Sequence, residues 1–110
     1  MKEAITDILS VLCTLLDPLI KASKRERITL ALARLERQAG LLDENLESEN
    51  FVRVHLITAM GALQFKQVPG LTIEQQIECA VGPLEDALAK IDLKLYWEWK
   101  ETESIFWKIH

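Results

Sequence analysis

Apolar residues recur at helical spacing over most of the chain. Between residues 4 and 20, leucines and isoleucines fall three and four positions apart and form one broad stripe. Asp17 and Pro18 interrupt this stripe, and proline ends or kinks a helix because it lacks an amide donor and crowds the preceding turn. The spacing therefore predicts a first helix over about residues 3–17.

A second amphipathic segment follows a short polar stretch. Its apolar positions alternate between steps of four and three, through Ile28, Leu32, Leu35, Ala39, Leu42 and Leu46. We expect a helix over about residues 23–40, capped at its C-terminal end by Gly40 and followed by an acidic loop over residues 43–50. A helix that continues to about Leu46 is an alternative, because an internal glycine costs only about 1 kcal/mol relative to alanine.

The segment over residues 50–67 fits two kinds of structure. Residues 51–57 contain β-branched side chains in partial alternation, which is typical of a strand. However, apolar residues from Val52 to Leu63 keep helical spacing, and the sequence offers no second strand to pair with the first. A lone strand leaves its backbone groups unpaired, so we predict a third helix over about residues 50–67.

The last third of the chain begins with a turn at residues 68–70. Thr72 and Gln75 then form a capping-box pattern, in which each side chain can bind an exposed backbone amide of the first helical turn. One apolar stripe continues from Ile73 to the C-terminus and stays in phase through Gly82 and Pro83. We therefore predict one long helix over residues 73–108, kinked at Gly82-Pro83.

These four helices predict an all-α fold, an antiparallel bundle in a single domain over residues 1–110. The chain of 110 residues, with 49% apolar and 27% charged residues, is long enough to bury one core. The first stripe is too short and too charged to span a bilayer, and no cleavage site follows it. We expect a cytoplasmic protein without a membrane partner.

Cys13 and Cys79 lie far apart in the sequence, each within an apolar helical pattern. No zinc-binding pattern accompanies them, and a single long-range disulfide is an alternative that nothing in the sequence supports. We expect two buried thiols in a reducing compartment.

Five of the seven aromatic residues lie between Tyr96 and His110. On a helical projection Trp99 and Phe106 fall on the apolar stripe, whereas other large side chains lie on its flank or opposite it. Such residues are typical of protein interfaces, which predicts a surface formed by Leu93, Tyr96, Trp97, Lys100 and Trp107. Packing within one subunit is one alternative, and contact with a hydrophobic ligand or a membrane surface is another.

Basic residues share one side of the second predicted helix, at Lys24, Arg27, Arg34 and Arg37. This face indicates a second hypothesis, contact with nucleic acid or with an acidic partner such as the loop over residues 43–49 of another copy. The net charge of −4 and the acidic segment after Gly40 make nucleic acid the less favoured of these partners.

Carboxylates suggest a weaker third hypothesis, a metal-dependent nucleotide hydrolase. Glu44 and Glu47 have the spacing that all-α MazG-like nucleotide pyrophosphatases use for magnesium, but the second acidic pair of those enzymes is missing. Residues 43–49 also imitate part of a calcium loop, with Val54 where the bidentate glutamate should stand. His55 and His110 have no partner residues that would make a ligand set or a general base.

The sequence therefore predicts no catalytic residue, no metal and no cofactor. The favoured function is noncatalytic: a small interaction or regulatory protein that binds protein through its aromatic C-terminal helix and forms a homodimer.

Overall fold

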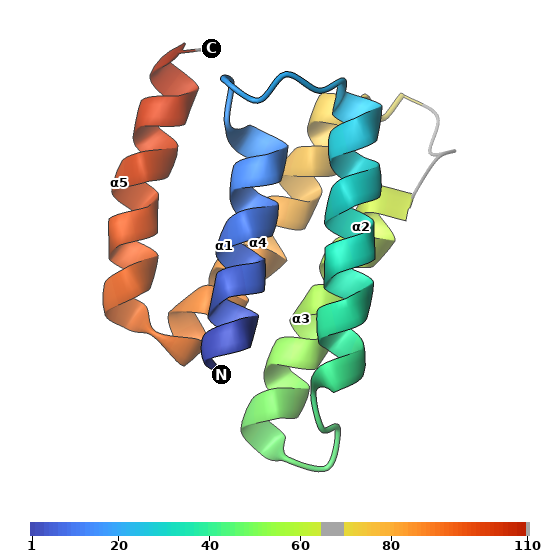
Figure 1. Cartoon of the computed structure of the whole chain (residues 1–110), viewed down its shortest axis with the longest axis vertical. Coiled ribbons are helices and arrows are strands. Elements are labelled where there is room, and N and C mark those ends of the chain that lie inside the picture. The colour runs from blue at the N-terminus through green and yellow to red at the C-terminus, as the bar shows by residue number, and fades with distance from the viewer. Residues whose placement is uncertain (65–69, 110) are drawn as a thin grey trace.

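The computed structural model describes residues 1–64 and 70–109, and five helices account for most of them (Figure 1). They are α1 (Lys2–Leu16), α2 (Lys24–Leu41), α3 (Glu47–Gln64), α4 (Ile73–Ile91) and α5 (Leu93–Ile109). The described residues contain no strand, which confirms the all-α prediction. None of these helices combines the length and the apolar character needed to cross a membrane.

Successive helices run in opposite directions, and the chain rises and falls along the long axis of the molecule (Figure 1). Helices α1 to α4 surround the core, with α3 packed most extensively against α4 and α1 against α2. Helix α5 lies at the edge of this group, where it packs on α4 and touches α1. Its opposite side therefore faces away from the bundle.

The core is built from the apolar stripes that define the helices. Fully buried side chains come from each of the first four helices, for example Ile8, Leu35, Leu56, Leu84 and Leu88. Helix α5 contributes Trp99, which is 4% exposed. Burial of one large apolar side chain stabilises a fold by about 1.5–3 kcal/mol, so the matching stripes are the main reason that these helices pack together.

The predicted long C-terminal helix is wrong, because the chain reverses at Asp92. This residue adopts an extended conformation at the end of α4, with its N–H bound to the carbonyl of Leu88 at 2.8 Å. Its Oδ1 accepts the N–H of Leu95 at 3.1 Å, so its side chain caps the start of α5. One residue thus ends one helix and begins the next, and the bundle has five helices instead of four.

Helix α4 is continuous through Gly82-Pro83, the position of the predicted kink. A proline ring disfavours helical backbone in the preceding residue partly through contact with that residue's Cβ. Gly82 has no Cβ, which removes this contact and allows the helix to proceed. The continuous apolar stripe was therefore a correct sign of a helix across this position, although not across Asp92.

Helix boundaries depart from the prediction at α2 and α3. Helix α2 ends at Leu41 with Leu42 extended, so Gly40 belongs to the last turn and is not the cap, and the extension to Leu46 is also wrong. Helix α3 begins at Glu47 and includes residues 51–57, which confirms helix over strand there. The predicted end of this helix at residue 67 lies outside the described residues.

The capping box before α4 is confirmed. The Thr72 hydroxyl accepts the N–H of Gln75 at 3.2 Å, and Oε1 of Gln75 accepts the N–H of Thr72 at 2.9 Å. Gly70 precedes this cap with a φ of +86°, a left-handed conformation that residues with a Cβ rarely adopt. The other two residues of the predicted turn, Val68 and Pro69, lie outside the described residues.

Candidate interaction surface on the C-terminal helix

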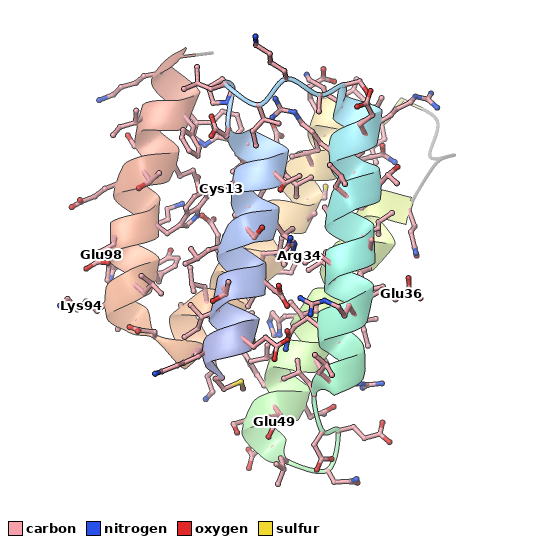
Figure 2. All side chains as sticks on the ribbon, in the orientation of Figure 1. Cys13, Arg34, Glu36, Glu49, Lys94 and Glu98 are labelled. Atoms are coloured by element: carbon pink, nitrogen blue, oxygen red, sulfur yellow. The ribbon has the colours of Figure 1, made fainter. Side chains whose placement is uncertain are left out.

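The outward face of α5 consists of exposed residues that recur every three or four positions, with two neighbours at one turn: Leu93, Trp97, Glu101, Ser104 with Ile105, and Lys108. Trp97 is 61% exposed and lies one turn after Leu93, which is 59% exposed. Lys94 and Glu98 border this face and extend away from the bundle (Figure 2). An exposed tryptophan beside two exposed aliphatic side chains forms an apolar patch with a charged border.

The inward face of α5 is occupied by the residues that the apolar stripe assigned to the core. Trp99 is buried, and its ring meets that of Phe106 edge to face, with ring centroids 6.0 Å apart. Such aromatic pairs add about 0.5–1.5 kcal/mol beyond the area that they bury. These two rings therefore attach α5 to α4 and α1.

The remaining predicted interface residues lie on the flank of α5 that faces the bundle. Tyr96 is half-buried against the core, and its ring meets the edge of Trp97 at a centroid distance of 5.1 Å. Trp107 is 45% exposed and lines a small groove of about 220 Å³ with residues of α1, α2 and α4. Lys100 extends toward two carboxyl groups of its own subunit. Of the predicted set, Leu93 and Trp97 are the residues that the bundle leaves most open.

Lys100 belongs to an acidic cluster, which we define as the buried residues Glu85, Trp99 and Glu103 with the more accessible Lys100 and Trp107. The Trp99 indole donates to Oε2 of Glu85 at 2.7 Å, and the Trp107 indole donates to Oε1 of Glu103 at 3.1 Å. The Lys100 ammonium lies 3.4 Å from both Glu85 oxygens and 3.3 Å from Oε1 of Glu103. The side chains of both glutamates are 11% exposed.

The two acids of the cluster differ in proton affinity. Burial, and after it the hydrogen bond to Glu103, raise the pKa of Glu85 to about 7 against the opposing effect of the Trp99 indole. Burial also acts to raise the pKa of Glu103, but hydrogen bonds from Glu85, Trp107 and Lys100 outweigh it and lower that pKa. Glu85 is thus the proton donor of the pair, and Glu103 is the ionised acceptor.

The predicted basic face of α2 is bound to other parts of the same chain. Arg34 and Arg37 extend to the carboxylate of Asp7 in α1, at 3.1 and 2.9 Å, and Figure 2 shows Arg34 directed toward α1. Lys24 pairs with Glu74 of α4. Arg27 is buried and donates to the carbonyls of Asp17, Ile20 and Ala22, which stabilises the loop after α1.

The acidic residues before α3 also have local roles. Oδ1 of Asp43 accepts the N–H of Asn45 at 2.9 Å, and Oε1 of Glu49 accepts the N–H of Asp43 at 3.1 Å. Oε2 of Glu44 lies 3.7 Å from Nη2 of Arg53. Within the described residues, no three histidine, cysteine or acidic side chains are grouped as metal ligands.

The two thiols are free, but their environments differ from the prediction. Cys13 lies on α1 and is half-buried against the core, whereas Cys79 is exposed on α4. The expectation of two buried thiols is therefore wrong for Cys79. The apolar spacing around Cys79 belongs to Ile77, Ala80 and Val81, which turn inward and leave the cysteine outside.

Three relevant residues were not singled out from the sequence. Ile105 lies four residues after Glu101, which itself lies four residues after Trp97, so all three fall on one broad face of a helix. Glu103 lies four residues after Trp99, so its place within the apolar stripe was the available sign of burial. Glu85 follows Leu84 in α4, and no sequence pattern marks it.

No protein-family model, curated protein or solved structure matches this chain. Its function must therefore be inferred from its own residues.

Proposed function

We propose that this protein acts by binding protein, and that the outward face of α5 joins two copies of the chain into a homodimer. The observation that carries this proposal is the exposure of Trp97 between Leu93 and Ile105 on one helix face. Tryptophan is enriched at binding hot spots because it covers a large area with little loss of side-chain freedom. An apolar patch with a charged border is also the usual composition of a protein interface.

A second copy is the partner that fits this face best, because the face is self-complementary. In an antiparallel pair of α5 helices related by a two-fold axis near Glu101, Trp97 of each copy lies opposite residues 104 and 105 of the other. The small Ser104 side chain leaves room for the indole, and Ile105 offers it an apolar contact. Every such contact occurs twice in a symmetric dimer.

The expected affinity is modest. One helix face buries less than the area of about 800 Å² per partner that typifies stable complexes. We therefore expect a dissociation constant in the micromolar range, which corresponds to a free energy of association on the order of −8 kcal/mol. Glu101 would meet its own copy near the axis, and this repulsion weakens the dimer further.

The proposal is tested by sedimentation velocity over roughly 1 to 300 µM protein, a range that spans a micromolar equilibrium. We expect wild type to shift from monomer to dimer, Trp97→Ala and Leu93→Ala to remain more monomeric, and Glu101→Gln to associate more strongly. Leu30→Ala is the matched control, because Leu30 in α2 has the same exposed fraction as Leu93, 59%. Far-ultraviolet circular dichroism checks that each variant folds.

A wild type that stays monomeric throughout this range would refute the proposal. An equal effect of Leu30→Ala and Leu93→Ala would show that general surface hydrophobicity, and not the outward face of α5, drives any association.

A further inference from the structure

The contact between α4 and α5 encloses two acids and one cation. Glu85 of α4 is 9% exposed and Glu103 of α5 is 8% exposed, and the ammonium of Lys100 lies within 3.4 Å of oxygens of both. If both acids were ionised, the cluster would carry one uncompensated negative charge. Burial of an unbalanced charge is unfavourable, so one proton on the pair removes the excess.

The hydrogen bonds of the cluster also require that proton. Oε2 of Glu85 accepts from Trp99, and Oε1 of Glu103 accepts from Trp107 and Lys100. Oε2 of Glu103 is buried, and no N–H group of the described residues donates to it. Two carboxylates have no proton to share, whereas a protonated Glu85 gives the pair a donor for the hydrogen bond between the two acids.

Other titratable groups around the cluster are bound elsewhere or are not charged at neutral pH. On α1, Asp7 and Glu3 bind Arg37 of α2, and Cys13 is a half-buried thiol whose pKa is raised by burial and by Asp17. On α3, Arg53 lies toward Glu44 and Nδ1 of His55 lies 2.8 Å from the carbonyl of Phe51. On α2, Lys24 pairs with Glu74 of α4. Within the described residues, Lys100 is therefore the cation that balances the cluster.

We propose that Glu85 and Glu103 form a proton-dependent latch: one shared proton holds α5 on α4, and loss of that proton loosens α5 while α1 to α4 stay folded. The latch acts at this place because α5 contacts only α4 and, to a small extent, α1 among the described helices. Its core contribution is Trp99, with Leu95, Tyr96 and Phe106 partly buried beside it. Loosening would expose Trp99 and the apolar side of α4 that it covers.

The direction of the pH dependence follows from the two acids. Because the docked state holds the Glu85 proton up to a pKa of about 7, and the undocked state loses it near the ordinary value of 4.5, docking weakens as pH rises between these values. Above about pH 7 no further change is expected from this group. The pKa of Glu103 is lowered in the docked state, so the ionised Glu103 stabilises docking at and above its ordinary pKa of 4.5. This stabilisation is lost only as the pH falls below that value. Docking should thus be strongest in mild acid.

Hydrogen exchange followed by mass spectrometry tests the latch, at a protein concentration where the chain is monomeric. Rates at about pH 5 and pH 8 are corrected for intrinsic exchange and compared for residues 93–108 and for α3. We expect the opening equilibrium of α5 to increase on the order of a hundredfold at the higher pH, while α3 changes little. In Glu85→Gln the neutral amide can donate to Glu103 at every pH, so the increase should disappear.

Asp86→Asn is the matched control, because Asp86 is the exposed neighbour of Glu85 on α4 and should leave the pH dependence intact. If Glu85→Gln fails to fold, Glu103→Gln serves instead. Its one remaining carboxyl group is balanced by Lys100 without a shared proton, so the increase in α5 opening at the higher pH should disappear there too. Equal α5 exchange at both pH values in wild type would overturn the latch. A pH dependence that persists in Glu85→Gln, or that appears equally in α3, would also overturn it.

Discussion

Nη2 of Arg37 in α2 donates to both carboxylate oxygens of Asp7 in α1, at 2.9 Å each. Asp7 is 1% exposed, whereas the side chain of Arg37 is 54% exposed. Arg34 adds a third bond at 3.1 Å. A buried carboxylate is therefore held between two helices by guanidinium groups that remain accessible to water.

Removal of both arginines should destabilise the fold. We expect Arg34→Ala combined with Arg37→Ala to lower the free energy of unfolding by about 2–3 kcal/mol, because Asp7 would stay buried without a partner. The expected value is below the range for fully buried pairs, since water already reaches both arginines. Urea unfolding followed by circular dichroism measures this change in the free energy of unfolding. Arg25→Ala, which removes an exposed cation from the same helix, should change the free energy of unfolding by less than about 0.5 kcal/mol. If Arg25→Ala destabilised the fold as much as the double variant, pairing with Asp7 would not be the cause.

The cap at Asp92 should control the order of the first turn of α5. We expect Asp92→Ala to cost about 1 kcal/mol, because the N–H of Leu95 loses its acceptor. Faster hydrogen exchange in the first turn of α5 would report this loss. Asp92→Asn keeps an acceptor at the same position and should exchange nearly as wild type. If the asparagine variant exchanged as fast as the alanine variant, the cap would not be the cause.

Two glycines should respond oppositely to alanine. Gly70 has a φ of +86°, so Gly70→Ala should lower the free energy of unfolding by about 1–2 kcal/mol through backbone strain. Gly61 lies inside α3 with no neighbouring atom within 4 Å of an added Cβ, so Gly61→Ala should stabilise by about 0.5–1 kcal/mol. Thermal and urea unfolding of the two variants give the signs. Effects of the same sign would show that one of these backbone assignments is incorrect.

The two thiols should differ in reactivity. Cys79 is exposed, whereas burial and the nearby charge of Asp17 raise the pKa of Cys13 and reduce its thiolate fraction. We expect iodoacetamide at pH about 8 to modify Cys79 at least about tenfold faster than Cys13. Peptide mapping by mass spectrometry measures both rates in one sample. In denaturing urea the rates should converge, and a difference that persists there would have to come from the local sequence instead of the fold.

Apolar spacing was sufficient to predict the helices because each one buries a continuous stripe. It correctly favoured helix for residues 51–57 and assigned Trp99 to the core. The same signal failed at Asp92, because a helix and its antiparallel neighbour can both turn apolar residues inward, and the stripe then appears unbroken through the reversal. The sign of the reversal was a cap-forming aspartate before a new apolar turn.

The polar contacts were less accessible from the sequence. The pairing of Asp7 with Arg34 and Arg37, and that of Glu85 with Glu103, joins residues that lie on different helices. Their distances depend on the rotation and register of each helix, which apolar spacing does not determine. For this reason four cations of α2 resembled an open basic face, although they bind within the same chain.

Asp92 is the only residue between α4 and α5. The number of residues on each side of it therefore determines which side chains of the two helices meet. Glu85 lies seven residues before Asp92 and Trp99 seven residues after it, so two helical turns on each side bring them to the same height. One residue inserted after Asp92 would rotate every later side chain by about 100° and shift it by about 1.5 Å relative to α4. The indole of Trp99 would leave Glu85. Substitution of an exposed residue of α5 therefore leaves the packing of this hairpin intact, whereas a change in the number of its residues would dismantle it.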